Sequence, residues 1–157
     1  MLTKELKIAY QEYNSVEEME EMDRKLYLEA IDATKSSYAP YSKFNVGAAV
    51  LMDNGSIVKG SNQENAAYPS GLCAERTAIF AAHAQYPDAN IKTLAVTASV
   101  DGVLLKEAVA PCGACRQVMA ESQRRSGSSI RIIFGGSNKI LIFNSVDDLL
   151  PFIFNSI

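Results

Sequence analysis

An Asn-Gly turn between two strand-like segments limits the possible folds of this chain more than any other local pattern. The apolar residues 45–52 end at Asp53-Asn54-Gly55-Ser56, and the strand-like residues 57–60 follow directly. Because Asn-Gly accepts positive φ at both central positions of a tight turn, this pattern predicts a β-hairpin. Helical and strand-like segments alternate after the hairpin, which indicates an α/β protein with a mixed sheet.

The other elements are predicted from apolar periodicity and from cap residues. Ser15 and Glu18 form a capping-box pattern before a long amphipathic segment. In chain order, we expect a helix over 16–36, strands over 45–52 and 57–60, a helix over 73–85, a strand over 91–100, a helix over 112–125, strands over 130–134 and 140–143, and a short helix over 147–154 that Pro151 interrupts. Together they predict a single domain over residues 1–157, a three-layer α/β/α sandwich around a five-stranded mixed sheet.

Charge and hydropathy exclude several classes of partner. Lys and Arg number 15 against 18 Asp and Glu, a formal charge of −3, so we expect no nucleic acid polymer as a partner. No apolar run approaches the roughly 20 residues of a membrane helix, and residues 1–7 lack the apolar core of a signal peptide. We therefore expect a cytoplasmic protein without a membrane partner. In that compartment the three cysteines are not expected to form disulfides.

The three cysteines lie at two predicted helix starts. Cys73 opens one helix, and Pro111-Cys112-Gly113-Ala114-Cys115 opens the other. Cys112 and Cys115 share one side of a helical turn, and helix N-termini favour thiolates. If the two starts converge, three thiolates can bind one zinc ion and leave a fourth position open, as in catalytic zinc sites. Glu75 could then move protons between water and substrate.

Each of these residues also has a simpler interpretation. A C-x-x-C pair alone is often a redox pair or half of a structural zinc site. Cys73 alone could be a small buried residue that packs like an apolar one. Glu75 alone could be a glutamate exposed to solvent on a helix. His83 lies two to three turns beyond Cys73, which is too far to bind the same metal, so we interpret it as non-catalytic. The combination is more specific, because a ligand-x-Glu followed by Pro-Cys-x-x-Cys is the pattern of zinc deaminases, including a Cys₃ variant.

Three blocks of the sequence resemble the small, homotetrameric class of cytidine deaminases. They are residues 41–49, residues 62–69 continuing into 73–77, and residues 111–117, with a weaker match at 149–154. The resemblance covers roughly residues 25 to 154. It implies hydrolytic deamination of cytidine and deoxycytidine at C4 to uridine and deoxyuridine plus ammonia, a reaction of pyrimidine salvage.

The resemblance also implies roles for the site residues. One zinc ion per subunit would be bound by Cys73, Cys112 and Cys115, and Arg76 would hydrogen-bond the thiolates and offset their charge. Glu75 would be the proton carrier. The remaining implied contacts of the nucleoside substrate are Phe44 and the backbone near Ala74 for the base, Asn62 and Glu64 for the ribose hydroxyls, and, from neighbouring subunits of a homotetramer, Ala66, Tyr68 and Phe154, with Phe152 as the alternative to Phe154.

Some features leave alternatives open. Without the resemblance, Asn62 and Glu64 are interpreted as polar loop residues and Phe44 as part of the core. Residues 1–20 form an N-terminal extension of unassigned role, in which 6–10 could be a short strand or an arm, and the loop 101–110 is longer than in the family.

Three other functions remain to be weighed. A nucleotide deaminase would need Lys or Arg near a 5′-phosphate, where this sequence offers Glu64. A polynucleotide editor would need a basic channel and stacking aromatic residues. A structural zinc or redox module without catalysis predicts that Glu75→Ala leaves every function intact.

Overall fold

The hairpin expected around Asn54-Gly55 lies at one side of the sheet. In the computed structural model, which describes residues 1–155, strands β2 (Phe44–Met52) and β3 (Ile57–Ser61) pair antiparallel on either side of this turn. Gly55 has a φ of 86°, a left-handed conformation that glycine adopts without steric cost. The hairpin prediction is therefore confirmed.

The sheet has seven strands, two more than predicted. Its order is β1-β7-β6-β4-β2-β3, with β5 paired to β4; within residues 1–155, β4 and β6 are the only strand pair that runs parallel. The strands not yet bounded are β1 (Gln11–Tyr13), β4 (Ile91–Val100), β5 (Val103–Leu104), β6 (Arg131–Gly135) and β7 (Ile140–Phe143). The two additional strands, β1 and β5, are too short to show a period of two in the sequence and depend on pairing with longer strands.

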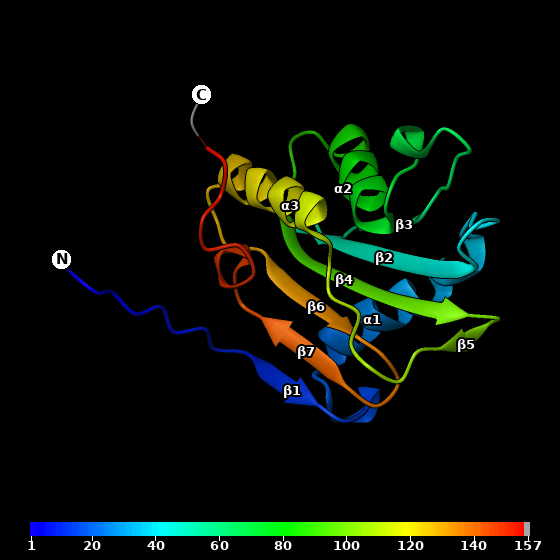
Figure 1. The fold of residues 1–157 in the computed structure, drawn as a ribbon, viewed down its shortest axis with the longest axis horizontal. Helices are drawn as coiled ribbons and strands as arrows, with labels where there is room; N and C mark the ends of the chain where they lie inside the picture. Colours follow the sequence, from blue (N-terminus) through cyan, green and yellow to red (C-terminus); the bar gives the residue numbers. More distant parts are fainter. Residues whose placement is uncertain (156–157) are drawn as a thin grey trace.

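Helices cover both faces of the sheet, as predicted. Helix α1 (Glu21–Ala33) lies on one face, and α2 (Ala74–Gln85) and α3 (Gly113–Ser126) lie on the other (Figure 1). Neighbouring strand residues accordingly point into two separate cores: Ile132 belongs to the cluster under α2 and α3, and Ile133 to the cluster under α1. The result is the three-layer α/β/α arrangement.

The predicted helix over 16–36 is wrong in extent. The chain forms a 3₁₀ turn at Val16–Glu18, breaks, and continues as α1. Met19 lies in the break with extended backbone and is 5% exposed, so burial of this side chain overrides the helical pattern. Ser15 makes no side-chain cap bond; instead, the Glu18 carboxylate accepts a hydrogen bond from the backbone N–H of Asn14 at 2.9 Å.

The predicted final helix over 147–154 is also wrong. Only a 3₁₀ turn forms, at Val146–Asp148, where the Ser145 side chain accepts a hydrogen bond from the backbone N–H of Asp147. Residues 150–155 are irregular and run beside α3 (Figure 1). Pro151 lacks the N–H group that a longer helix would need there.

The first ten residues form an arm rather than a strand. They extend away from the rest of the molecule (Figure 1). Pairing begins only at Gln11, where β1 joins the edge strand β7, and the Tyr10 ring stacks on Phe143 with 5.3 Å between ring centroids. Among the described residues 1–155, no helix is both long and apolar enough to cross a membrane.

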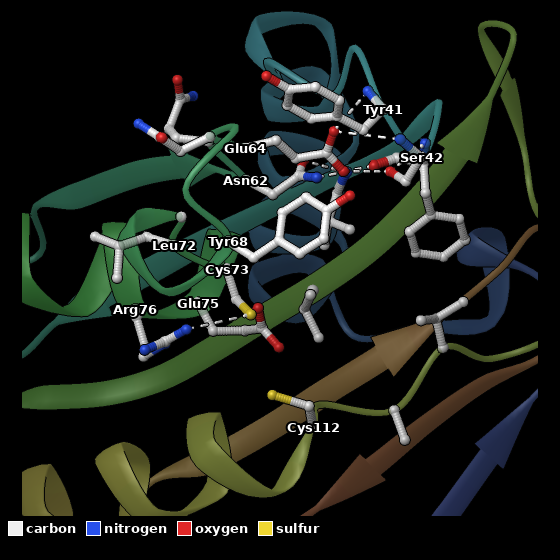
Figure 2. A pocket seen from close by; sticks show the side chains of 18 residues that line it. Tyr41, Ser42, Asn62, Glu64, Tyr68, Leu72, Cys73, Glu75, Arg76 and Cys112 are labelled. Atoms are coloured by element: carbon white, nitrogen blue, oxygen red, sulfur yellow. Dashed lines mark hydrogen bonds between the residues drawn. The ribbon is translucent and has the colours of Figure 1, made fainter.

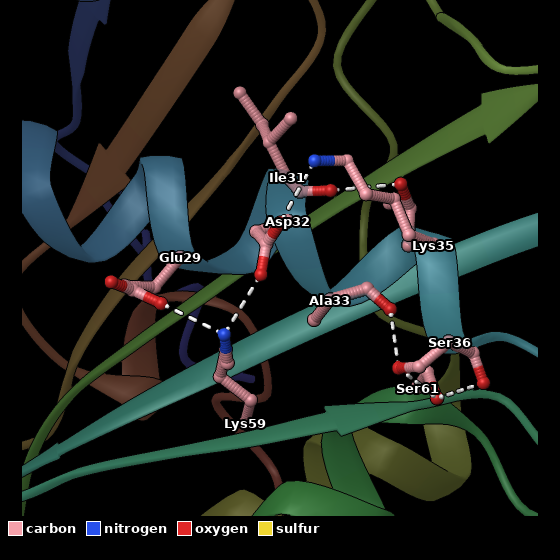
Figure 3. A network of polar contacts seen from close by, with 9 residues as sticks. Glu29, Ile31, Asp32, Ala33, Lys35, Ser36, Lys59 and Ser61 are labelled. Atoms are coloured by element: carbon pink, nitrogen blue, oxygen red, sulfur yellow. Dashed lines mark hydrogen bonds and ion pairs between the residues drawn. The ribbon is translucent and has the colours of Figure 1, made fainter.

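A polar network fastens α1 to the hairpin (Figure 3). Lys59 on β3 donates to Asp32 at 2.9 Å and contacts Glu29 at 3.1 Å, while Lys35 contacts Asp32 at 2.9 Å. Hydrogen bonds from Lys59 and Lys35 lower the pKa of Asp32 to about 2. These side chains are about half exposed, so each pair adds little stability.

Candidate active site

The two predicted helix starts converge. Cys73 is the N-cap residue of α2, Cys112 is the N-cap residue of α3, and Cys115 lies in the first turn of α3. Their three sulfur atoms all lie within 4.8 Å of one another. Both helices flank β4 in the sequence and lie on the same face of the sheet, which brings their N-termini together (Figure 1).

The three thiols fit a single zinc ion. Three thiolates are a donor set that zinc prefers, and they leave its fourth tetrahedral position free. Sulfur atoms around one tetrahedral zinc lie roughly 3.8 Å apart, so small side-chain movements bring all three to bonding distance. Cys115 is buried, Cys73 is half-buried and Cys112 is exposed, so the cluster faces solvent on one side.

The cluster already favours thiolate at Cys73. A hydrogen bond from Cys115 and the Arg76 guanidinium, whose Nη2 lies 3.7 Å from the Cys73 sulfur, lower the pKa of Cys73 to about 5. The pKa of Cys115 is raised, because its proton is shared with Cys73 and its side chain is buried. Arg76 therefore supplies the positive charge that a cluster of thiolates needs.

Glu75 is the acidic group nearest the cluster. It lies in the first turn of α2, two residues after Cys73, and is only 4% exposed. Figure 2 shows its carboxylate between Cys73 and Cys112. Burial raises the pKa of Glu75, with a contribution from the Cys73 charge. A carboxyl group whose pKa is raised by burial is suited to accept and return a proton.

A cavity of about 830 Å³ opens over these residues (Figure 2). Its volume lies in the range typical of small-molecule sites. The end opposite the cysteines is formed by the segment before β2 and the segment after β3. The lining residues are Tyr41, Ser42, Phe44, Val46, Asn62, Gln63, Glu64, Asn65, Tyr68, Gly71, Leu72, Cys73, Glu75, Arg76, Val96, Val109, Ala110 and Cys112.

Asn62 has nearly all of its hydrogen-bonding capacity engaged. Its Oδ1 accepts hydrogen bonds from the Ser37 hydroxyl at 2.6 Å and from the backbone N–H of Val46 at 2.8 Å. Its Nδ2 donates to the Phe44 carbonyl at 2.8 Å, which leaves one N–H for another partner. Asn62 therefore joins the start of β2 to the end of β3.

Glu64 binds the turn before β2. Its carboxylate accepts hydrogen bonds from the backbone N–H groups of Tyr41 (2.9 Å) and Ser42 (3.3 Å) and from the Ser42 hydroxyl. The hydrogen bond from Ser42 is the main cause of a lowered pKa at Glu64, so this carboxylate is ionised. The turn includes Lys43 at a φ of 58°, a left-handed conformation that is uncommon for residues other than glycine.

Sequence reasoning named no role for Tyr41 or Ser42 individually. Both line the cavity, and the Tyr41 ring packs edge-on against Tyr68 with 6.4 Å between ring centroids. Their only sequence signal was their position in the block 41–49. The contacts between Ser42 and Glu64 join residues 22 positions apart, so they depend on the tertiary fold.

Not every predicted site residue lies in the cavity. Phe44, Asn62, Glu64 and Tyr68 line it, whereas Ala66, Ala74, Cys115 and Phe154 do not. Ala74 is fully buried at the start of α2. Phe154 and Phe152 are 67% and 88% exposed. Tyr68, although it lines the cavity, is 80% exposed.

His83 lies outside the cavity lining, as expected for a residue without a catalytic role. Its Nε2 lies 3.1 Å from the Ser122 hydroxyl, between α2 and α3. Burial and the nearby Arg125 charge lower the pKa of His83, so the neutral imidazole is favoured.

Comparisons with known proteins agree with this geometry. The family model described as "Cytidine and deoxycytidylate deaminase zinc-binding region" matches residues 20–127. Cytidine deaminase from Halalkalibacterium halodurans is 50% identical over 101 residues, which is 64% of this chain and 72% of that protein. Cytidine deaminase from Sporosarcina psychrophila is 50% identical over 97 residues, covering 62% and 67% of the two chains.

Solved structures show the same similarity. The crystal structure of cytidine deaminase from Burkholderia pseudomallei matches with a TM-score of 0.70 and 35% identity, covering 87% of this chain and 100% of that chain. The crystal structure of cytidine deaminase from Mycobacterium tuberculosis matches with a TM-score of 0.66 and 33% identity, covering 88% and 100%.

Proposed function

Since this chain belongs to the family of cytidine and deoxycytidylate deaminases, we propose that it hydrolyses the 4-amino group of cytidine and deoxycytidine to give uridine or deoxyuridine and ammonia. The observation that carries this proposal is the placement of the buried Glu75 carboxylate beside three converging cysteines at the base of a nucleoside-sized cavity. A redox or structural site would not need such a carboxylate.

We infer that Cys73, Cys112 and Cys115 hold one zinc ion per subunit. The chemistry that zinc supplies in a site with three protein ligands is the acidification of a coordinated water molecule. The Arg76 guanidinium beside Cys73 offsets part of the negative charge of three thiolates, which would otherwise oppose this effect.

Glu75 carries the protons of the reaction. Hydrolysis forms a C4–O bond and breaks the C4–N4 bond, while one proton goes to ring N3 and another to the departing amine. The Glu75 carboxylate accepts a proton from the attacking water, delivers it to N3, and then assists protonation of the 4-amino group. Its burial favours this use, because a raised pKa makes the carboxylate a stronger proton acceptor than a solvated glutamate.

The opposite end of the cavity suits a ribose. Phe44 offers a ring against the base, the remaining N–H of Asn62 can donate to a hydroxyl, and the ionised Glu64 can accept from one. A negative charge at Glu64 opposes a 5′-phosphate, so the free nucleoside is the preferred substrate over the nucleotide.

We also propose that the enzyme works as a homotetramer with shared active sites. Phe154 lies outside the cavity of its own subunit and is exposed, and Tyr68 is exposed at the cavity rim. Both are large side chains for which contact with a neighbouring subunit would remove apolar surface from water. In this arrangement Ala66, Tyr68 and Phe154 contribute to neighbouring sites.

Ultraviolet monitoring of cytidine with the zinc-loaded protein tests the proposed reaction. We expect conversion to uridine with equal release of ammonia, similar conversion of deoxycytidine, and little reaction with dCMP. Folded, zinc-loaded protein that leaves both nucleosides unchanged would refute the proposal. Turnover of dCMP alone would assign a nucleotide substrate instead.

A further inference from the structure

The three cysteines of the site are supported unequally. Cys115 is buried within α3 and the Cys73 sulfur contacts Arg76, whereas Cys112 is exposed at the end of the loop 105–111. The start of this loop, at the end away from Cys112, is held by two backbone hydrogen bonds. Ser137 donates to the Leu105 carbonyl (2.7 Å) and Asn138 donates to the Lys106 carbonyl (3.0 Å). Within the described residues 1–155, positions 107–111 make no such backbone bond, so the part of the loop next to Cys112 depends on side-chain contacts.

Arg116 supplies such a contact. Its Nε donates to the Pro111 carbonyl at 2.9 Å, and its Nη1 donates to the Leu149 carbonyl at 3.0 Å. The side chain leans toward the N-terminus of α3, as long helical side chains do, and so reaches the residue directly before Cys112. The planar Arg116 guanidinium thus joins the loop 105–111, which precedes Cys112, to the C-terminal segment 149–154.

The C-terminal segment is itself firmly held. Leu149 and Leu150 donate their backbone N–H groups to the Val146 carbonyl, both at 2.9 Å, and both side chains pack on the core under α3. The neighbouring Gln117 donates to the Phe154 carbonyl at 2.9 Å and accepts from the Phe154 N–H at 3.0 Å. Arg116 is therefore anchored to a segment whose position is fixed at two points.

We propose that Arg116 is a positioning residue that holds Cys112 in the orientation required for zinc binding by bracing the Pro111 carbonyl against the C-terminal segment. The inference rests on the proposed function only for the identity of the metal. Lysine cannot replace it, because the three N–H donors of an ammonium share one nitrogen, whereas Arg116 reaches the two carbonyls from two separate nitrogens, Nε and Nη1. Loss of the brace leaves Cys112 free to turn toward solvent.

Zinc competition with a fluorescent chelator on the full chain tests the proposal. We expect Arg116→Lys to lower zinc affinity about tenfold to a hundredfold, the usual effect of losing a residue that orients a metal ligand. Replacing zinc with Co²⁺ gives a second readout. The thiolate-to-cobalt charge-transfer bands should change in the Arg116 variant, because the Cys112 thiolate no longer binds the metal in its wild-type orientation.

Two arginines provide matched controls. Arg131 makes three kinds of side-chain bond, to Asp23, Asn144 and Gln11. Asp23 belongs to α1, on the face of the sheet opposite the cysteines, so Arg131→Lys should lower the melting temperature without changing zinc affinity. Arg124 is an exposed residue of the same helix α3, paired with Glu121 at 3.6 Å, and Arg124→Lys should change neither quantity.

The outcomes separate this inference from the proposed function. Folded Arg116→Lys protein with wild-type zinc affinity would overturn the role of Arg116. If this variant does not fold, Arg116→Gln, whose amide can reach only one carbonyl, takes its place with the same expected loss. Wild-type protein that binds zinc and releases no ammonia from cytidine overturns the proposed function and leaves the Arg116 measurement valid; wild-type protein that binds no zinc overturns both.

Discussion

Glu75 shows how a single side chain acquires its chemistry from its position. Its spacing from Cys73 places it in the same helical turn, which is a local consequence of the sequence. Its 4% exposure, in contrast, comes from the packing of α2 over the sheet and of α3 across the cavity. Because a solvated glutamate would keep its ordinary pKa, the fold is the source of the raised value.

Replacement of Glu75 by glutamine separates proton transfer from metal binding. Glu75→Gln keeps the size and burial of the side chain but cannot carry a proton, so we expect kcat to fall about 10²- to 10⁴-fold while zinc content stays at one per subunit. Steady-state kinetics and metal analysis measure the two effects. Glu121→Gln, on the exposed side of α3, is the control and should behave as wild type. A Glu75→Gln enzyme with most of its activity would refute the role of Glu75.

Removal of one thiol tests the zinc ligands. Cys112→Ala leaves two sulfurs, and because Cys112 is exposed the substitution creates no cavity in the core. We expect loss of zinc from the purified protein, with the fold retained as judged by circular dichroism. Full zinc occupancy in this variant would contradict the assignment of Cys112 as a ligand.

At the scale of elements, two glycines allow the helices to approach the hairpin from opposite faces. A Cβ atom at Gly47 would lie 2.1 Å from the Ala30 carbonyl of α1, and one at Gly60 would lie 2.4 Å from the backbone nitrogen of Ala78 in α2. Neither pair of backbones can approach this closely with a side chain between them. The close packing of α2 on β3 helps to set the height of Cys73 and Glu75 above the sheet.

The Gly47→Ala substitution tests this packing. The added methyl group meets backbone rather than a flexible side chain, so α1 or β2 must shift, and we expect a loss of stability of about 1–3 kcal/mol or more. Urea unfolding monitored by circular dichroism measures it. Gly113→Ala is the control for stability, because a Cβ there has no atom within 4 Å and Ala favours helix over Gly. If Gly47→Ala and wild type had equal free energies of unfolding, α1 and β2 would be able to move apart to admit the methyl group without loss of stability, and the role of Gly47 in close packing would be wrong.

At the scale of the whole molecule, large aromatic side chains at and near the candidate site are exposed in the single chain. Tyr68 is exposed at the rim, and Phe154 is exposed while its backbone is held by Gln117. An aromatic ring kept in contact with water by a fixed backbone is costly unless another surface covers it. Shared active sites in a homotetramer remain our explanation for this arrangement.

Hybrid tetramers test the sharing of sites. Phe154→Ala alone should raise KM, and Glu75→Gln alone should lower kcat by the same factor as above. When the two variants are co-assembled, a site with an intact Glu75 can receive Phe154 from the neighbouring chain, so activity should exceed the sum of the separate preparations. Replacing Phe154→Ala by Phe152→Ala in the same experiment shows which ring is used. Simple additivity in both mixtures would exclude sharing through either residue.

Much of the fold could be predicted from the sequence because its signals are local. The turn at Asn54-Gly55, the strand 91–100 and the helix starts at Cys73 and Cys112 all appear within one residue of their predicted places. The wrong predictions, the helix over 16–36 and the helix over 147–154, concern segments where tertiary contacts outweigh local propensity. Burial of Met19 interrupts the first, and side chains of α3 hold the backbone of the second.

The spacing of residues in the sequence predicts the composition of the candidate site: three cysteines at two helix starts, with Glu75 two residues after Cys73. Cys112 and Cys115 lie three residues apart, so they share one side of a helical turn wherever the helix lies. Only the tertiary structure decided that the two starts meet, that Glu64 binds the turn at Ser42, and that Arg116 reaches both Pro111 and Leu149. These contacts join segments up to 42 positions apart (Cys115 and Cys73), and their distances are set by how α2 and α3 pack on the sheet rather than by any local pattern.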